Sequence, residues 1–275
     1  MLEAERHRMI LRLLEQRSIV GIGDFVESLS SSDATVRRDI AALAEGGRLR
    51  RVRGGAEAIN PRLEAHLVGM PFTMSEEVAV AQKRAIAKAA SGLIDDNDSI
   101  IIAGGTTTCA LVEFLAVRQL DILTNSLPIV TKLVATSRNR VSMPGGTVYR
   151  EQKIILSPFE HDATANFWAR KAFVGCYGIN RHGVMEADPL IVQAEVRLLK
   201  RTEQVIVMAD SRKFNKHSSI VVLSLENISA FITDEGASES DLEPLRRAGV
   251  NVIIAGIGAA DTGGVPSAGF SPSTQ

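Results

Sequence analysis

The sequence predicts two domains: a small winged helix-turn-helix domain, then a larger α/β domain with a mostly parallel sheet. Residues 1–58 carry helical apolar patterns followed by an arginine-rich stretch bounded by glycines. Residues 76–256 alternate short apolar strand-like runs with amphipathic helix-like runs, the pattern of a parallel sheet covered on both faces. Between them the periodicity lapses and Asn60-Pro61, Gly69 and Met70-Pro71 interrupt any helix, so we expect a linker at 59–75. A small, polar, Gly/Pro/Ser-rich stretch at 257–275 predicts a disordered tail.

Two short helices are expected before the arginine-rich stretch. In 5–17 the apolar residues Ile10, Leu11, Leu13 and Leu14 form one face, and 22–30 repeats this with Ile22, Phe25, Val26 and Leu29. Three consecutive serines at 30–32 then provide a tight turn.

A third helix is predicted from about Asp33 to Glu45. Val36, Ile40 and Leu43 recur at i, i+4 and i+7, which places them on one buried face. Ser32 is suited to cap its N-terminus, and Gly46-Gly47 to end it. Its exposed face near the N-terminus carries Thr35, Arg37 and Arg38, where a recognition helix enters the major groove.

The segment GGRLRRVRGG predicts a β-hairpin wing, with Leu49 and Val52 facing the helices. From Arg37 to Arg53 six arginines stand against two acids, a local net charge of +4 in a chain of net charge −1. A solvated amphipathic helix with a basic loop would have the same composition, but three helices followed by a wing favour DNA binding. The expected DNA-contacting residues are Ser32, Thr35, Arg37, Arg38, Arg50, Arg51 and Arg53.

Residues 5–56 resemble the DeoR family of bacterial sugar-catabolism repressors. Arg6 with Ile10-Leu11 matches the family's R-x-x-x-I-L start, residues 35–40 read TVRRDI as its recognition helix does, and residues 51–56 read RVRGGA at the wing. Many members carry a histidine where Arg53 stands. The resemblance implies a repressor that binds double-stranded operator DNA.

The expected elements of the second domain follow one another as strand and helix. After a helix at 76–94 we expect the strands SIIIA (99–103), DILT (121–124), RVSMP (140–144), AFVGC (172–176), QVIVMAD (204–210), SSIVVLS (218–224), AFITD (230–234) and NVIIAG (251–256). The expected intervening helices are LVEFLA (111–116), SLPIVTKLVA (126–135), LIVQAEVRLLKR (190–201) and DLEPLRRAG (241–249).

Four of these strands lead into residues suited to an anion. Glycines let a backbone approach a ligand, and a following helix N-terminus offers free N–H groups. Each loop alone has an ordinary structural explanation, whereas the four together indicate a phosphate, with Lys213 as the cation and Asn125, Glu195 and Asp210 accepting sugar hydroxyls. The expected effector-binding residues are Gly104, Gly105, Thr106, Thr107, Thr108, Asn125, Ser126, Gly145, Gly146, Glu195, Asp210 and Lys213.

The resemblance to the DeoR family continues here and implies a sensor domain with a ribose-5-phosphate-isomerase-like fold that binds phosphorylated sugars. Motifs between residues 50 and 215, such as ILTNSLPIV and VMADSRKF, are most similar to the repressors of L-ascorbate utilisation, which implies a sugar-acid phosphate such as L-ascorbate 6-phosphate. Ala103 and Tyr177 stand where many members carry acidic or polar residues, which weakens a catalytic interpretation. A sugar-phosphate isomerase with an N-terminal interaction domain is the alternative.

Composition excludes several other classes. No 18-residue apolar run is present and the start has no signal-peptide pattern, so we expect a cytoplasmic protein that does not enter membranes. Cys109, Cys176 and the five histidines show no metal-ligand spacing, and we expect no metal and no cofactor. Because a single DNA-binding domain of this size buries little DNA surface, we expect a homo-oligomer, either a dimer or a tetramer. Repression or activation depends on the operator's position.

Overall fold

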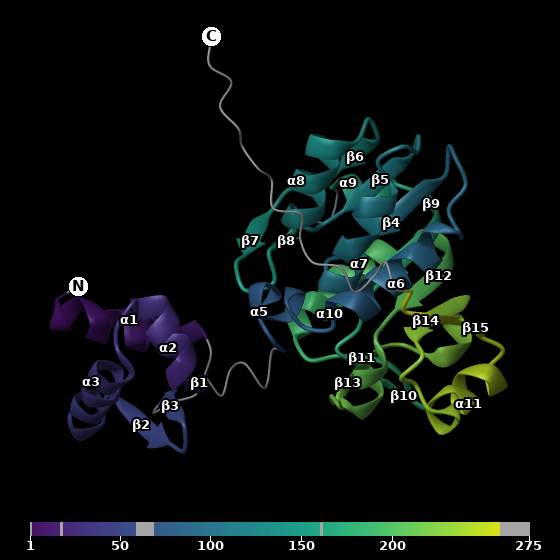
Figure 1. Ribbon diagram of the computed structural model, residues 1–275. Coiled ribbons are helices and arrows are strands. Elements are labelled where there is room, and N and C mark those ends of the chain that lie inside the picture. The colour runs from purple at the N-terminus through teal and green to yellow at the C-terminus, as the bar shows by residue number, and fades with distance from the viewer. Residues whose placement is uncertain (1, 17–18, 59–68, 160–161, 259–275) are drawn as a thin grey trace, which may run out of the picture. The chain divides into compact units, whose positions relative to one another are not determined.

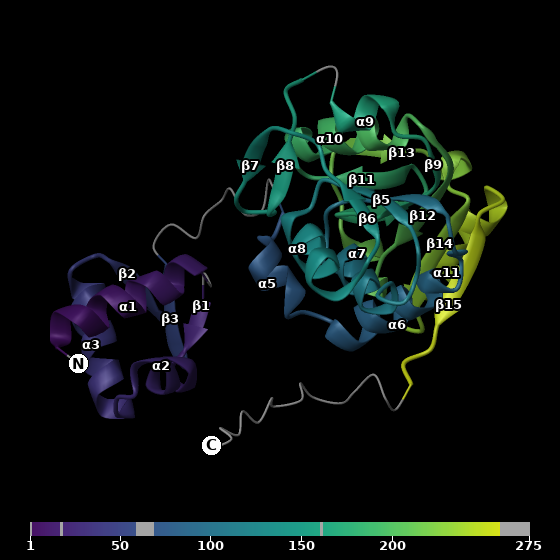
Figure 2. The same cartoon turned by 90° about the horizontal axis from the view of Figure 1, so that it is seen from above.

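The computed structural model describes residues 2–16, 19–58, 69–159 and 162–258. By their internal contacts these form two compact units, residues 1–74 and 75–275, which Figures 1 and 2 show with their elements labelled. Residues 259–275 of the predicted tail (257–275) and residues 59–68 of the predicted linker (59–75) lie outside the described residues.

The first unit is a winged helix-turn-helix domain. Its elements are α1 (Glu3–Gln16), β1 (Ile19–Gly21), α2 (Ile22–Leu29), α3 (Asp33–Glu45), β2 (Leu49–Val52) and β3 (Gly55–Ala58). The three strands form an antiparallel sheet in the order β1-β3-β2. The sequence patterns predicted the three helices and the hairpin and missed β1, which is only three residues long.

The predicted apolar faces meet in one core. Ile10 of α1, Phe25 of α2 and Ile40 of α3 are each at most 2% exposed. Leu49 from the wing joins the same cluster, so the wing packs against the helices as expected. Burying side chains of this size contributes about 1.5–3 kcal/mol each, which holds a domain this small together.

The second unit contains a seven-stranded, all-parallel sheet in the order β15-β14-β12-β9-β4-β5-β6. Its strands are β4 (Ser99–Ile102), β5 (Asp121–Thr124), β6 (Arg140–Ser142), β9 (Ala169–Val174), β12 (Thr202–Met208), β14 (Ala230–Asp234) and β15 (Asn251–Ala255). The helical segments are α5 (Phe72–Glu76), α6 (Val80–Ser91), α7 (Thr106–Ala110), η1 (Leu111–Phe114), α8 (Leu127–Thr136), α9 (Ala163–Asn166), α10 (Pro189–Leu199), η2 (Ser211–Asn215), η3 (Leu225–Asn227) and α11 (Glu239–Arg247). The predicted parallel sheet is therefore confirmed.

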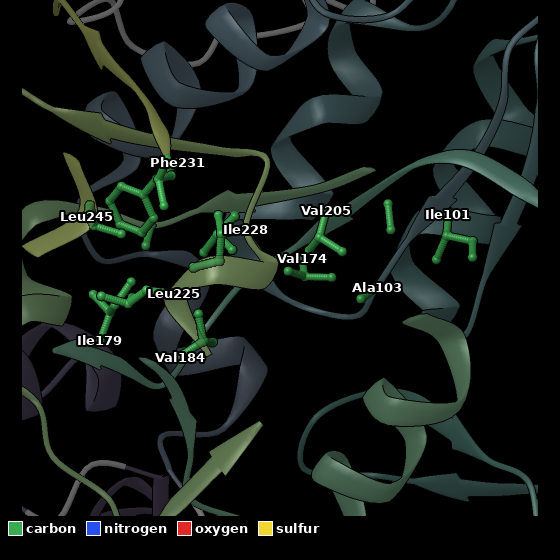
Figure 3. Packing of buried hydrophobic residues seen from close by; sticks show 14 of the residues in the cluster. Ile101, Ala103, Val174, Ile179, Val184, Val205, Leu225, Ile228, Phe231 and Leu245 are labelled. Atoms are coloured by element: carbon green, nitrogen blue, oxygen red, sulfur yellow. The ribbon is translucent and has the colours of Figure 1, made fainter. Parts of the chain in front are cut away.

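Both faces of this sheet are covered. Alternate side chains such as Ile101, Val174 and Val205 point to one face and pack with Ile179, Val184 and Leu225 (Figure 3). That face lies against α10 and a small antiparallel sheet of β10 (Gly178–Asn180), β11 (Gly183–Glu186) and β13 (Ile220–Leu223). Helix α6 packs on the opposite side of β12, β14 and β15, as Figure 2 shows from above.

Two expectations for the secondary structure of the second unit were wrong in detail. The single helix expected at 76–94 is interrupted, because Ala79 has a φ of +52° and α6 begins only at Val80. The strand at 218–224 joins the small antiparallel sheet instead of the parallel one. Helix α5 lies partly in the stretch expected to be linker. The hairpin of β7 (Thr147–Tyr149) and β8 (Ile154–Leu156) has no counterpart among the expected elements.

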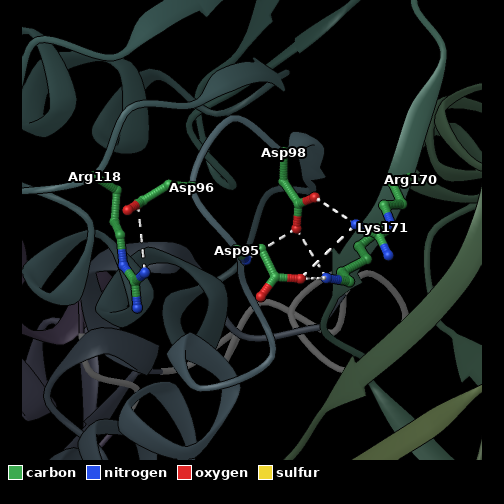
Figure 4. A network of polar contacts seen from close by, with 6 residues as sticks. All are labelled: Asp95, Asp96, Asp98, Arg118, Arg170 and Lys171. Atoms are coloured by element: carbon green, nitrogen blue, oxygen red, sulfur yellow. Dashed lines mark hydrogen bonds and ion pairs between the residues drawn. The ribbon is translucent and has the colours of Figure 1, made fainter.

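An ion-pair network fixes the amino-terminal ends of the central strands (Figure 4). Lys171 of β9 donates to Asp98, just before β4, at 2.8 Å, and Arg170 reaches the other oxygen of Asp98 at 3.2 Å. Asp95 and Asp98 together neutralise the buried Lys171. None of the helices in the described residues is long and apolar enough to cross a membrane.

Candidate functional site

The N-terminus of helix α3 is held by a side-chain cap. The Ser32 hydroxyl accepts the backbone N–H of Thr35 at 3.3 Å and lies 2.9 Å from the Thr35 hydroxyl. Val36, Ile40 and Leu43 are buried as predicted. The predicted N-cap is therefore confirmed, and the Ser32 hydroxyl is already engaged in capping the helix.

Arg37 and Arg38 are both exposed on the first half of α3. Arg37 forms an i,i+4 ion pair with Asp33, with Nε 2.5 Å from Oδ1. Arg38 has no hydrogen-bond or ion-pair partner within the described residues. Because exposed pairs contribute little, Arg37 can exchange Asp33 for a nucleic-acid partner at small cost.

The wing presents three further arginines. Arg50, Arg51 and Arg53 are exposed on β2 and the turn that follows it, whose Gly54 adopts a φ of +86°. Arg50 pairs across the hairpin with Glu57, with Nε 2.9 Å from Oε2. The wing packs against α3, so the DNA-binding unit carries exposed guanidinium groups on both elements.

A buried brace holds α3 against α1. Asp39 on α3 is 4% exposed and accepts two hydrogen bonds from Arg6, at 2.6 Å from Nε and 3.0 Å from Nη2. His7 Nε2 lies 3.3 Å from the same carboxylate. These hydrogen bonds from Arg6 keep the pKa of Asp39 below its ordinary value of 3.8. Arg6 and Asp39 therefore hold α3 against α1.

In the second unit the candidate site lies at the carboxyl edge of the sheet. The chain leaves β4 toward β5 on one side and later returns to β9 on its other side, so the order of connections reverses between β4 and β9. Open α/β sheets bind ligands beside such a reversal. The loops after β4, β5 and β12 all open at this edge, because the strands are parallel.

The loop after β4 carries the residues predicted for phosphate. Gly104 donates its N–H to Asn125 Oδ1 at 2.9 Å, and Gly105, with a φ of +156°, leads into α7. A Cβ on Gly104 would lie 2.3 Å from Ile154 Cγ2, so a larger residue there requires the buried Ile154 side chain to move. The Thr108 hydroxyl donates to the Gly105 carbonyl at 3.0 Å, which ties the loop to its helix.

The loop after β5 contributes a buried hydroxyl without a partner. Ser126 Oγ is buried and makes no hydrogen bond within the described residues. Buried polar groups are normally paired, so such a hydroxyl is a candidate ligand contact. By contrast, Gly145 and Gly146 follow the edge strand β6 and are exposed. A Cβ on Gly146 would lie 2.2 Å from the Leu156 carbonyl oxygen, which gives that glycine a packing role in the β7–β8 hairpin.

The loop after β12 brings charge to the edge. Asp210 is 1% exposed, and its two oxygens accept from Arg212 Nε at 2.7 Å and Nη2 at 3.0 Å. The Asp210 side chain is thus engaged by Arg212, a partner that the sequence analysis did not single out. The Lys213 side chain is half-buried and forms no ion pair with an acidic side chain within the described residues.

Two buried glutamates complete the surroundings. Burial raises the pKa of Glu195 on α10 well above its ordinary value of 4.5, and the charge of Glu186 on β11 raises it further. Burial also raises the pKa of Glu186, while Lys213 opposes that rise. Both side chains are buried, and a carboxyl group can hydrogen-bond a hydroxyl of a ligand.

A pocket opens beside Asn125 at the same edge. It is lined by Asn125, Pro144, Ile155, Leu156, Ser157, Asp162, Thr164, Leu190, Gln193, Ala194, Arg197 and Leu198. Gln193 and Asn125 supply amide groups there, and Arg197 is held by the carbonyl oxygens of Ser157 and Phe159. The residues described here contain no group of three His, Cys, Asp or Glu side chains placed to hold a metal.

The sequence analysis missed one further cation of this region. Lys83 is buried on α6, and the charges of Asp210, Lys213 and Arg212 act on it. The available signal was its position: Ile86 and Ala90 lie three and seven residues later, so Lys83 shares their apolar face. A lysine placed among buried apolar residues indicates a specific partner.

Comparison with known proteins matches both units to one family. A model described as the DeoR-like helix-turn-helix domain matches residues 6–62, and the DeoR C terminal sensor domain matches residues 78–235. The chain is 32% identical to proteins named HTH-type transcriptional regulator UlaR from Shigella dysenteriae serotype 1 and Escherichia coli O1:K1. Each similarity covers 92% of this chain and 99% of the relative.

Solved structures give more distant similarities. Ribose 5-phosphate isomerase A from Neisseria gonorrhoeae is 16% identical with a TM-score of 0.35, over 52% of this chain. The chain spans about half the length of that isomerase, 55%. The full-length sorbitol operon regulator SorC from Klebsiella pneumoniae is 9% identical with a TM-score of 0.35, over 93% of this chain and 97% of that chain.

Proposed function

This chain belongs to the DeoR family of transcriptional regulators, and on that premise we propose that it is a repressor released from its operator by a phosphorylated sugar or sugar acid. The winged helix holds the DNA, and the second unit binds the effector. Release requires the effector to bind the DNA-free arrangement more tightly, by a coupling of about 1–3 kcal/mol.

On the DNA side, we assign sequence readout to α3 and backbone contacts to the wing. Thr35, Arg37 and Arg38 stand on the exposed N-terminal half of α3, where side chains reach base edges. Arg51 and Arg53 in the wing suit phosphate contacts, which position a protein without reading sequence. Arg50 joins them by giving up Glu57, and Ser32 keeps the helix cap in place.

On the effector side, one observation carries the proposal: a glycine loop and a cation open at the same edge of a parallel sheet, beside its reversal point. The N–H groups of Gly105, Thr106 and Thr107 at the start of α7 suit the phosphate oxygens, because the first amides of a helix have no intrahelical partner. Lys213 supplies the balancing charge. The unpartnered hydroxyl of Ser126 supports a ligand at this position.

The sugar part of the effector would meet the buried carboxyls and the amides. Glu195 is buried with a raised pKa, and Asn125 borders the pocket that opens at the same edge. We infer L-ascorbate 6-phosphate as the first compound to test, because this chain's motifs are most similar to repressors of L-ascorbate utilisation and its relatives are named UlaR. Homo-oligomerisation through the second unit and a cytoplasmic location belong to the same proposal.

We place no reaction in this site. An isomerase needs a base positioned at the substrate carbon, and this chain has Ala103 and Tyr177 where many family members carry acidic or polar residues. The isomerase alternative is tested by measuring directly whether the purified chain converts ribose 5-phosphate in solution. Turnover would support the enzyme and remove the basis for a pure sensor.

The DNA and effector assignments are tested by separate variants of the full chain. Arg37→Ala and Arg38→Ala are expected to lose operator selectivity and to keep the thermal shift produced by ligand. Lys213→Ala is expected to bind operator normally and to respond weakly to ligand. Normal operator selectivity in both arginine variants would overturn the readout assignment, and a normal ligand response in Lys213→Ala would remove Lys213 from the site.

A further inference from the structure

Lys83 is a buried ammonium with spare hydrogen-bonding capacity. It lies on α6 at 4% exposure, and its Nζ donates to the backbone carbonyl of Ser75. An ammonium carries three N–H donors. Within the described residues, the Ser75 carbonyl is the one hydrogen-bond acceptor of the Lys83 ammonium, so two of its donors remain for another partner.

The charges near Lys83 leave room for an anion. Asp210 is the carboxylate that acts on it most strongly, but Arg212 already holds both oxygens of Asp210. Lys213 and Arg212 repel the Lys83 charge, and Glu76 attracts it more weakly. Burial is the largest effect and lowers the pKa of Lys83 to about 8. A phosphate in this position would relieve both the burial cost and the repulsion between cations.

Ser75 brings Lys83 to the glycine loop after β4. Its hydroxyl lies 3.3 Å from the hydroxyl of Thr106, the first residue of α7, while its carbonyl accepts from Lys83. Lys83 and Thr106 therefore contact the same residue, one at its carbonyl and the other at its hydroxyl. Ser75 is thus the one residue that links the Lys83 ammonium to Thr106, whose backbone amide is suited to the phosphate.

We propose that Lys83 is an additional ligand of the effector's phosphate and that it binds this phosphate in exchange for the Ser75 carbonyl. The inference rests on the proposed function, because it needs a phosphorylated effector at the strand ends. It adds to the site a residue of α6, which lies outside the strand-end loops. The phosphate and the Ser75 carbonyl then compete for the Lys83 ammonium.

The exchange would act on the point where the chain enters the second unit. Ser75 is the first residue of that unit and lies in α5, and the Val78 amide donates to the same Ser75 carbonyl at 3.2 Å. When Lys83 turns to the phosphate and Thr106 does the same, Ser75 loses both contacts. Effector binding thereby loosens the segment through which the second unit is joined to the DNA-binding unit.

Binding measurements on the full chain test the first half of this inference. We would titrate the unmodified chain, Lys83→Met, Lys213→Ala and the exposed-lysine control Lys88→Met with L-ascorbate 6-phosphate, ribose 5-phosphate and inorganic phosphate by calorimetry. Lys83→Met removes one charge-assisted hydrogen bond and is expected to weaken binding about 10- to 100-fold, with Lys88→Met unchanged. Lys88 lies on the same helix and is exposed.

Amide hydrogen exchange on the unmodified chain tests the second half without any variant. The compound that binds in the titration is expected to speed exchange of the Val78 amide, and Lys83→Met is expected to show the faster exchange before ligand is added. Slower or unchanged exchange at Val78 on binding would overturn the coupling through Ser75.

The outcomes separate this inference from the proposed function. Binding that is weakened in Lys213→Ala and unchanged in Lys83→Met would overturn the role of Lys83 and leave the proposed function standing. No binding of any of the three compounds by the unmodified chain would overturn both.

Discussion

Replacing Asp39 by asparagine tests whether the Arg6–Asp39 brace positions the recognition helix. The carboxylate accepts at 2.6 and 3.0 Å from Arg6 and is nearly inaccessible to water. Hydrogen bonds to a charged group contribute about 1.5–3 kcal/mol, and the partial exposure of Arg6 places the expected loss at about 1–3 kcal/mol. An asparagine fits the space but presents an N–H₂ group to a guanidinium that has no use for a donor.

Amide exchange along α3 measures this loss. Since about 1.4 kcal/mol corresponds to a factor of ten, α3 amides are expected to exchange about 5- to 150-fold faster in Asp39→Asn. The control is Asp33→Asn on the same helix, whose exposed pair with Arg37 contributes little. Trp168, the only tryptophan of the chain, lies in the second unit, and its fluorescence is expected to stay unchanged in both variants. Equal exchange in Asp39→Asn and Asp33→Asn would refute the brace.

Three further predictions concern both units. Because the pKa of Asp39 is lowered in the folded chain, its ion pair stabilises the folded state above about pH 4, and this stabilisation is lost as the pH falls through the folded pKa. The α3 amides are therefore expected to lose protection from exchange selectively on acidification. Protection that does not fall selectively in α3 would contradict this. Gly104→Ala is expected to abolish effector binding while operator binding persists, because the added Cβ would lie 2.3 Å from Ile154 Cγ2. In Gly145→Ala the added Cβ meets nothing within 4 Å, so the Tm of that variant is expected to stay unchanged. Phosphate affinity is expected to fall from pH 7 to pH 9, because Lys83 loses its charge near pH 8. The charged groups that face Lys83 are Glu76 from α5 and Asp210, Arg212 and Lys213 from the loop after β12. Equal pH profiles for the unmodified chain and Lys83→Met would contradict this prediction.

The helices of the DNA-binding unit were predictable because their signals are local. Ser32 as N-cap and the i, i+4, i+7 spacing of Val36, Ile40 and Leu43 depend on residues within one helix, and α3 spans the predicted range. The strand β1 was not predictable, since three residues carry no periodicity and its pairing with β3 is a tertiary contact. In the second unit the break before α6 arises at Ala79, where a left-handed backbone occurs at a residue that gives no signal of it.

The candidate effector site was predictable at the strand ends and not beyond them. Gly104, Asn125 and Asp210 follow apolar strands directly, so the parallel topology alone brings their loops to one edge. The engagement of Asp210 by Arg212 and the placement of Lys83 against Ser75 depend on side-chain packing between distant elements. The DNA-contacting and effector-contacting residues themselves stay predictions.

The most direct test of the account measures operator release by the full chain. A duplex selected from a random-sequence library would be labelled, and its fluorescence anisotropy followed as L-ascorbate 6-phosphate, ribose 5-phosphate and unphosphorylated L-ascorbate are added. We expect selective binding that weakens steeply with salt, as contacts to several phosphates require, and release by a phosphorylated compound at concentrations where L-ascorbate has no effect. Selective binding that none of the phosphorylated compounds alters, or that L-ascorbate releases equally well, would contradict a sensor for phosphorylated sugars.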